Sequence, residues 1–202
     1  VFYDDMGSIG FVNLSFARKL EAKGIACRVF NPLLPGLNMF LNNRDHRKIV
    51  VIDGKTAFTG GVNLADEYIG ELERFGTWKD TAIMVQGEAV RNFTLMFLEI
   101  WNVDEPQENY EKYLDASYCY GMTEGEGYVI PYGDSPLDHE NVGELVYMDI
   151  LNNAKDYVHI MTPYLILDHE MLTALTYAAK RGVDVKIIMP GIPDKAYAFA
   201  LA

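Results

Sequence analysis

The sequence predicts an α/β fold, and three observations support this prediction. Apolar residues recur at helical spacing in residues 13–22, whereas residues 48–52 form a continuous β-branched run typical of a strand buried on both faces. Half of the 202 residues are hydrophobic and 23% are charged, as in an ordinary folded domain. Gly24 and Gly182 each close a helical pattern that leads into a strand pattern, an order typical of layered α/β proteins.

The first half of the chain is expected to alternate between helices and strands. Asp53-Gly54 is a strong signal for a two-residue hairpin turn, and Gly60-Gly61 ends the returning strand. Residues 32–44, with several Asn, Pro and Gly, are expected to form a loop. The expected strands are residues 1–3, 25–30, 48–52, 56–59 and 79–86, and the expected helices are residues 13–22 and 89–101.

Residues 104–127 differ from the rest, because they are acidic, rich in Tyr and Gly, and without periodicity. We interpret them as a linker between a first α/β unit at 1–103, which opens in mid-strand, and the beginning of a second at 128–202. Pro32 and Pro190 follow Gly24 and Gly182 at the same distance, a match that a duplication would explain. In the second unit, strands are expected at 128–132, 157–161 and 183–189, and helices at 141–154, at 169–181 and, just beginning, at 194–202.

The charge of the chain bears on its partners. The formal net charge is −12, from 29 acidic and 17 basic residues. Nucleic acid and anionic lipid repel such a chain at long range, so we expect no nucleic-acid partner. A small cationic pocket for one phosphate is still compatible with this composition, because local charge can oppose the net charge.

The cysteines and the apolar segments bear on compartment. Cys27 and Cys119 are far apart and lack metal-binding spacing, so we interpret them as thiols in a reducing compartment. No secretory signal is recognised, and residues 157–167, the most apolar stretch, are shorter than the ~20 residues that span a bilayer. The chain is expected to be soluble, while its oligomeric state is left open.

The residues with the clearest chemistry are His46 and Lys48, at the start of a predicted strand. Residues two apart on a strand face the same way, so the imidazole and the ammonium are expected to project together. An imidazole can attack or protonate at neutral pH, and an ammonium can hold the non-bridging oxygens of a phosphodiester. An isolated His-x-Lys pair is usually a solvated surface feature, so the interpretation depends on the spacing of further residues.

The predicted hairpin returns residues 60–63 to the start of that strand. The glycines Gly60 and Gly61 permit close approach, and the amide of Asn63 can donate to a phosphate. These residues are therefore expected to join His46 and Lys48 around one phosphate.

Carboxylates are needed near a catalytic histidine, usually to fix its tautomer. Asp53 lies an odd number of residues from His46 and should point to the other face, so we interpret it as an anchor of the hairpin. Asp80, at the start of strand 79–86, is the best candidate to orient His46, with Asp66 and Glu73 as alternatives.

The spacing of these candidate residues is similar to a known sequence motif. His46-x-Lys48-x4-Asp53, followed by Gly60 and Asn63, resembles the HxKxxxxD…G…N motif of the phospholipase D superfamily. The flanking segments resemble the cardiolipin synthase branch, and two later segments resemble the opening of the second repeat in those enzymes. The flanking segments are residues 43–54, 58–63, 66–70 and 76–81, and the later ones are Thr162-Pro163-Tyr164 and residues 182–194.

The resemblance implies a phospholipase D-like α-β-α sandwich, with one nearly complete repeat and the start of a second. It implies a catalytic motif of His46, Lys48, Asp53 and Asn63, with Gly61 beside the phosphate. In such enzymes two motifs share a site: one His forms a phosphohistidine and the other protonates the leaving alcohol. A cardiolipin synthase uses phosphatidylglycerol as donor and acceptor and releases glycerol, and the resemblance implies that neither a metal nor a cofactor is needed. Which role His46 takes is left open.

This sequence departs from the family pattern in one respect that matters. It holds one motif, and His139, His159 and His169 have no Lys two positions on. We therefore expect a piece truncated before the second motif, inactive or very weak alone, from a protein of the bacterial cytoplasmic membrane whose membrane helices lie outside these residues. Pairing of two copies through His46 is the alternative.

The same motif serves other functions. A phospholipase D that hydrolyses phosphatidylcholine and a nuclease both use it, and a silent scaffold domain could retain the fold. The acidic charge disfavours a nuclease, residues 66–70 favour the synthase, and the presence of His46 and Lys48 disfavours a silent domain.

Overall fold

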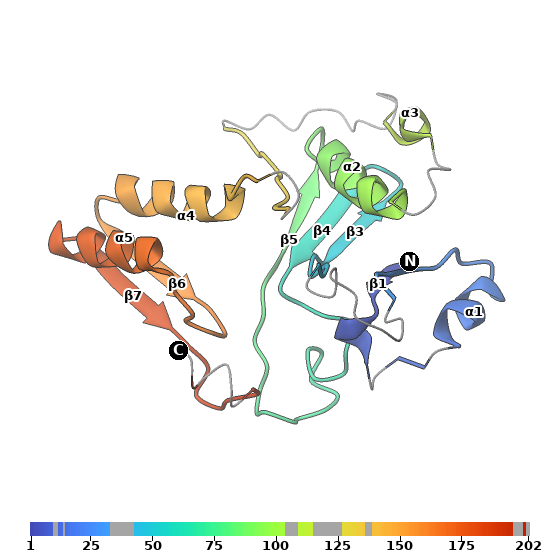
Figure 1. Ribbon diagram of the computed structural model, residues 1–202, viewed down its shortest axis with the longest axis horizontal. Helices are drawn as coiled ribbons and strands as arrows, with labels where there is room; N and C mark the ends of the chain where they lie inside the picture. The colour runs from blue at the N-terminus through green and yellow to red at the C-terminus, as the bar shows by residue number, and fades with distance from the viewer. Residues whose placement is uncertain are drawn as a thin grey trace. The chain divides into compact units, whose positions relative to one another are not determined.

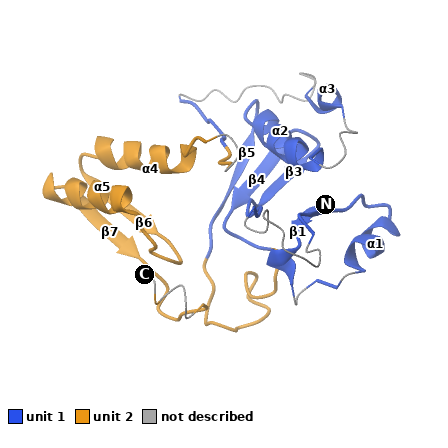
Figure 2. Ribbon diagram, in the orientation of Figure 1, with its two compact units in different colours: residues 1–63, 80–132 blue, residues 64–79, 133–202 orange. Residues whose placement is uncertain are grey.

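The computed structural model describes residues 1–9, 12–13, 15–32, 43–103, 109–114, 127–135, 139–195 and 200. Helices and strands alternate along the chain, which confirms the α/β prediction (Figure 1). Residues 1–63 and 80–132 form one compact unit, and residues 64–79 and 133–202 form another (Figure 2). The expected division at 104–127, the sandwich and the repeats stay predictions.

The first unit opens with a parallel strand pair. β1 (Phe2–Asp4) pairs with β2 (Arg28–Phe30), and the 3₁₀ helix η1 (Met6–Ser8) and helix α1 (Phe16–Glu21) lie between them in the sequence. Helix α1 starts three residues later than expected, because the Asn13 side chain accepts hydrogen bonds from the backbone N–H and the hydroxyl of Ser15 and holds a local turn. Gly24, at φ +78°, ends the helix as predicted.

An antiparallel sheet of three strands follows. β3 (Ile49–Ile52), β4 (Thr56–Gly60) and β5 (Ala82–Gln86) lie in that order. Asp53 and Gly54 have φ values of 54° and 66°, as their hairpin signal predicts. The turn is one residue longer than expected, because Ile52 pairs with Thr56. β5 begins three residues late, at Ala82, which pairs with the last residue of β4.

Helix α2 (Val90–Trp101) covers one face of this sheet (Figure 1). Its fully buried Val90 and buried Phe93 pack with Ala57 and Val85, and Ile49 and Val51 of β3 join this core. Burial of β3 on both faces was a wrong prediction, because β3 alternates between half-buried and exposed residues. The exposed ones are Val50 and Ile52, each 50% exposed. An antiparallel sheet can be packed on one face only, and α2 supplies that packing.

Two predictions around the expected linker have different outcomes. Residues 104–108 and 115–126 lie outside the described residues, and between them stands the short helix α3 (Tyr110–Tyr113). Residues 128–132 form no strand, so that prediction was wrong. Tyr128 is 97% exposed and Ile130 is 77% exposed. An apolar run becomes a strand only when a neighbouring strand pairs with its backbone groups, and here none of the described strands does so.

The second unit contains a βαβ arrangement with helices on one face. Helix α4 (Val142–Asn153), strand β6 (Tyr157–Met161), helix α5 (His169–Lys180) and strand β7 (Asp184–Ile188) all fall within one or two residues of their predicted bounds. β6 and β7 are parallel. Leu151 of α4 and Leu175 and Ala178 of α5 share a core with Val158 of β6. The residues expected to begin a last helix are only partly described.

Helices α1 and α5, which each precede the second strand of a parallel pair, end in the same way. The N–H groups of Gly24 and Ile25 donate to the carbonyls of Glu21 and Leu20, at 2.9 and 3.0 Å. Gly182 and Val183 repeat these bonds to Ala179 and Ala178, at 3.0 and 3.2 Å, and Gly182 also has a positive φ, of 94°. The two segments that follow Gly24 and Gly182 therefore match in their backbone hydrogen bonds as well as in their Gly-to-Pro spacing. None of the described helices is long and apolar enough to cross a membrane.

Candidate active site around His46 and Lys48

His46 and Lys48 lie in an extended segment that leads directly into β3. The strand begins at Ile49, one residue later than expected, so neither residue belongs to the sheet ladder. The His46 side chain is exposed and Lys48 is half-buried. The Lys48 ammonium donates to the backbone carbonyl of His46 at 2.6 Å, which places the cation beside the motif histidine.

Two carboxylates act on the Lys48 ammonium. Burial lowers the pKa of Lys48 below its ordinary value, while Asp45 and Asp80 act in the opposite direction and favour the charged form. Asp45 directly precedes the motif, and Asp80 comes from the segment before β5. A half-buried cation with acidic neighbours of this kind can exchange these contacts for the oxygens of a phosphate.

The hairpin brings Gly60 and Gly61 to this end of the sheet, as predicted, and the segment before β5 brings Asp80. Ile49 pairs with Thr59, and the Gly61 N–H donates to the Thr81 carbonyl at 3.1 Å. The Asp80 side chain lies so close to Gly61 that a Cβ atom there would stand 2.9 Å from the Asp80 carboxyl carbon. Glycine is therefore required at position 61 for Asp80 to occupy its place, where its carboxylate also accepts the Thr81 N–H at 2.7 Å.

The remaining predicted residues lie at different distances from this group. Asn63 is half-buried, two residues beyond Gly61. Asp53 lies in the hairpin turn, roughly 20 Å along the extended chain from His46, as the strand rise implies. It lines a cavity of about 740 Å³ together with Lys55 and Trp101, and neither His46 nor Lys48 is part of that lining. The structure thus brings Lys48, Gly61 and Asp80 together and keeps Asp53 apart.

The carboxylates proposed to orient His46 have different positions. Asp80 lies in the same compact unit as His46 and acts on Lys48, whereas a role toward the His46 imidazole stays a prediction. Asp66 and Glu73, the alternatives, are exposed and belong to the other unit. Their roles toward His46 likewise stay predictions.

Replacing Asp80 with asparagine is expected to lower the pKa of Lys48 further, because a carboxylate that favours the ammonium form is removed. An NMR titration of the Lys48 side chain measures this shift. Asp53→Asn is the matched control and should leave the Lys48 pKa unchanged. Equal Lys48 pKa values in the native chain and Asp80→Asn would contradict the assignment of Asp80 to this site.

Sequence reasoning assigned no role to Asp45, which the structure places at the centre of the segment. Its Oδ1 accepts the Arg47 backbone N–H at 3.2 Å and the Arg47 Nε–H at 2.9 Å. The available signal was its position in the sequence, because Asp45 directly precedes His46 and stands three residues before Lys48.

In the described part of the chain, neither a cysteine nor a cluster of metal ligands belongs to this group. Cys27 is buried, and burial raises the pKa of its thiol, while Cys119 lies outside the described residues. Within the described ranges, no three His, Cys, Asp or Glu side chains are grouped so that they could hold a metal ion.

Comparisons with known proteins cover part of the chain in one case and nearly all of it in others. Residues 147–200 match the family model "Cardiolipin synthase, PLD-like domain". Proteins named cardiolipin synthase from Alkalihalophilus pseudofirmus and Staphylococcus aureus are 38% and 36% identical over 201 residues. These alignments cover 98% of this chain but 39% and 40% of the two relatives. An uncharacterized protein of Streptococcus mutans is 58% identical over 202 residues, which is 43% of its length. The chain therefore spans about two-fifths of the length of the curated relatives it matches.

Proposed function

Because the chain is related along its whole length to bacterial cardiolipin synthases of the phospholipase D superfamily, we propose that it forms part of an enzyme that makes cardiolipin from two phosphatidylglycerol molecules. His46 supplies one of the two catalytic imidazoles. The observation that carries the proposal is the exposed His46 beside a half-buried ammonium, with glycines and Asp80 brought to the same end of the sheet.

The proposed reaction has two steps. One imidazole attacks the phosphorus of the first phosphatidylglycerol, and the bond to glycerol breaks. The second imidazole gives its proton to the departing glycerol oxygen, and a phosphohistidine remains. A hydroxyl of the second phosphatidylglycerol then returns a proton to that imidazole and displaces the histidine, which yields cardiolipin. Lys48 and Asn63 hold the non-bridging oxygens as negative charge builds in each transition state.

The proposed architecture is a phospholipase D-like sandwich of two repeats, at 1–103 and 128–202, joined by residues 104–127. The matching helix ends at Gly24 and Gly182, each followed by a strand in a parallel pair, support this repeat. A second motif, which these 202 residues do not contain, would complete the site. We therefore propose that this chain alone is inactive or very weak, and that the whole protein works at the bacterial cytoplasmic membrane, where its lipid substrate lies.

The test is to incubate the whole protein with phosphatidylglycerol vesicles and follow lipid products and free glycerol. Cardiolipin and glycerol in equal amounts are the expected products, and the 202-residue chain alone should form neither. Phosphatidic acid without cardiolipin would overturn the transfer reaction in favour of hydrolysis, which the same motif can perform. Cleavage of nucleic acid without lipid turnover would overturn the lipid assignment altogether.

A further inference from the structure

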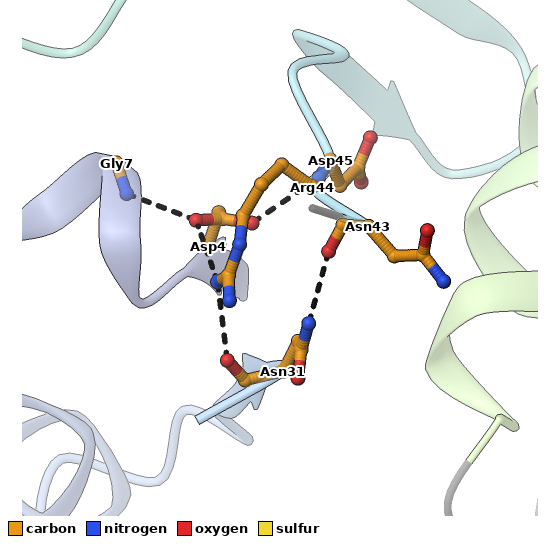
Figure 3. Close-up of polar contacts among 6 residues, drawn as sticks. All are labelled: Asp4, Gly7, Asn31, Asn43, Arg44 and Asp45. Carbon is orange, nitrogen blue, oxygen red and sulfur yellow. Dashed lines mark hydrogen bonds and ion pairs between the residues drawn. The ribbon is translucent and has the colours of Figure 1, made fainter. Parts of the chain in front are cut away.

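The carboxylate of Asp4 connects the end of β1 to the chain just before His46 (Figure 3). Its side chain is only 8% exposed. One oxygen accepts the Gly7 N–H at 2.9 Å, and the other accepts the Asp45 N–H at 3.1 Å. The Arg44 guanidinium lies 3.4 Å from the first oxygen. Both oxygens of a nearly buried carboxylate are therefore engaged by backbone groups far apart in the sequence.

A second connection runs from the end of β2. The Asn31 side-chain amide donates to the Asn43 carbonyl at 3.0 Å, and Arg44 donates to the Asn31 carbonyl at 3.1 Å. Three consecutive residues, 43 to 45, are thus bonded to residues at the carboxyl ends of the parallel strands β1 and β2. We call Asp4, Gly7, Asn31, Asn43, Arg44 and Asp45 the Asp4 network (Figure 3).

The Asp4 network holds a segment that lies outside the regular secondary structure. Residues 43–48 belong to no helix or strand, so no ladder hydrogen bonds set their path before Ile49. The next residue after the network is His46. Asp45 also binds Arg47 and acts on the charge of Lys48, so the position of its backbone affects the electrostatics of the motif as well.

We infer that Asp4 is a positioning residue for the His46–Lys48 motif: its carboxylate fixes the backbone at Asp45 and thereby the direction from which the imidazole and the ammonium reach a phosphodiester. This inference rests on the proposed function for its catalytic consequence. A displacement of about 1 Å at a reacting group can cost on the order of 10²-fold in rate, so a residue that touches no substrate can still control turnover.

Asp4→Asn in the whole protein tests this inference, because asparagine keeps the shape but has one acceptor oxygen for two backbone N–H groups. Hydrogen exchange at the Asp45 amide is expected to rise about tenfold, as loss of one hydrogen bond to a charged group implies, while exchange in β3, β4 and β5 stays unchanged. With phosphatidylglycerol as substrate, kcat should fall roughly 10- to 100-fold, with KM within about threefold of the native value.

Arg44→Met is the second variant, and it keeps the bond between Asp4 and the Asp45 N–H. It should raise exchange at residues 43–45 less than Asp4→Asn does. If Asp4→Asn fails to fold, Asp4→Glu, which keeps the charge but displaces both carboxylate oxygens, takes its place with the same expected changes in Asp45 exchange and kcat. Asp156→Asn, which changes an exposed carboxylate of the other unit, is the control and should alter neither readout.

Two results would overturn the inference: an Asp45 amide as protected in Asp4→Asn as in the native protein, or raised exchange with an unchanged kcat. Failure of the proposed function gives a different result, because the native protein would then form no cardiolipin while the exchange experiment still reports on Asp4.

Discussion

Replacing His46 with alanine in the whole protein is expected to lower the rate of cardiolipin formation by about 10³-fold or more. General acid–base catalysis alone contributes 10²- to 10⁴-fold, and the loss is larger where the imidazole is the nucleophile. The side chain is exposed, so its removal leaves no cavity in a core and the fold should be retained. The initial rate of cardiolipin release from phosphatidylglycerol vesicles measures the effect, with circular dichroism as the check on folding.

His169→Ala is the matched control, because His169 is an exposed histidine at the start of α5 and no lysine stands two positions after it. It is expected to retain the native rate. A His46→Ala protein that kept more than a tenth of the native rate would remove His46 from the chemistry. If the rate of His46→Ala falls as expected, trapping a lipid–phosphohistidine adduct on the native protein assigns the role of His46: an adduct on His46 makes it the nucleophile, and an adduct elsewhere makes it the acid.

Adding a methyl group at Gly61 is expected to lower the cardiolipin-forming rate roughly 10- to 100-fold, because it displaces the Asp80 carboxylate, which acts on the Lys48 ammonium of the proposed site. The Cβ of Gly61→Ala would stand 2.9 Å from the Asp80 carboxyl carbon, closer than real Cβ contacts allow. The Asp80 side chain must therefore move, and Lys48 loses part of the charge that favours its ammonium form. Stability should fall by about 1–3 kcal/mol, as overpacking usually costs.

Gly60→Ala provides a contrast at the neighbouring position. Its Cβ would stand 2.7 Å from the Ala82 Cα, so the methyl group meets the backbone of the paired strand β5 and not a movable side chain. We expect the greater loss of stability in Gly60→Ala and the more selective loss of turnover in Gly61→Ala. Gly191→Ala is the control, because among the described residues no atom beyond its two chain neighbours lies within 4 Å of the added Cβ. Native turnover in Gly61→Ala, measured beside its urea unfolding curve, would show that Asp80 has no part in the reaction.

The sequence predicted the elements best where local patterns were strong. α2, β6 and α5 begin and end within one residue of their predicted bounds, because their apolar spacing acts locally, as does the Asp168 cap of α5. Asp53-Gly54 was recognised as a turn for the same reason. The predicted strand at 128–132 failed because strand formation depends on a partner strand, and one sequence segment does not contain that information.

For the site too, features set by local sequence were predicted, and contacts between distant segments were not. The hairpin return of Gly61 toward the motif follows from a short turn and the two-residue period of strands, and it was correctly predicted. Asp80 was chosen as a partner for His46, and that role stays a prediction, while its charge also favours the ammonium form of Lys48. Asp4 was not considered, because it stands 41 residues from Asp45 and nothing local in either segment links them.

By itself, the sequence determined the α/β class, the order of most helices and strands, the hairpin turn and the spacing of the His46–Lys48 motif. These depend on backbone preferences and on contacts between residues near one another in the chain. Only the tertiary structure decided which face of β3 is covered, which carboxylates lie near Lys48 and how Asp4 holds the approach to His46. Each of these depends on segments distant in the sequence meeting in space, where burial and the geometry of hydrogen bonds select one arrangement.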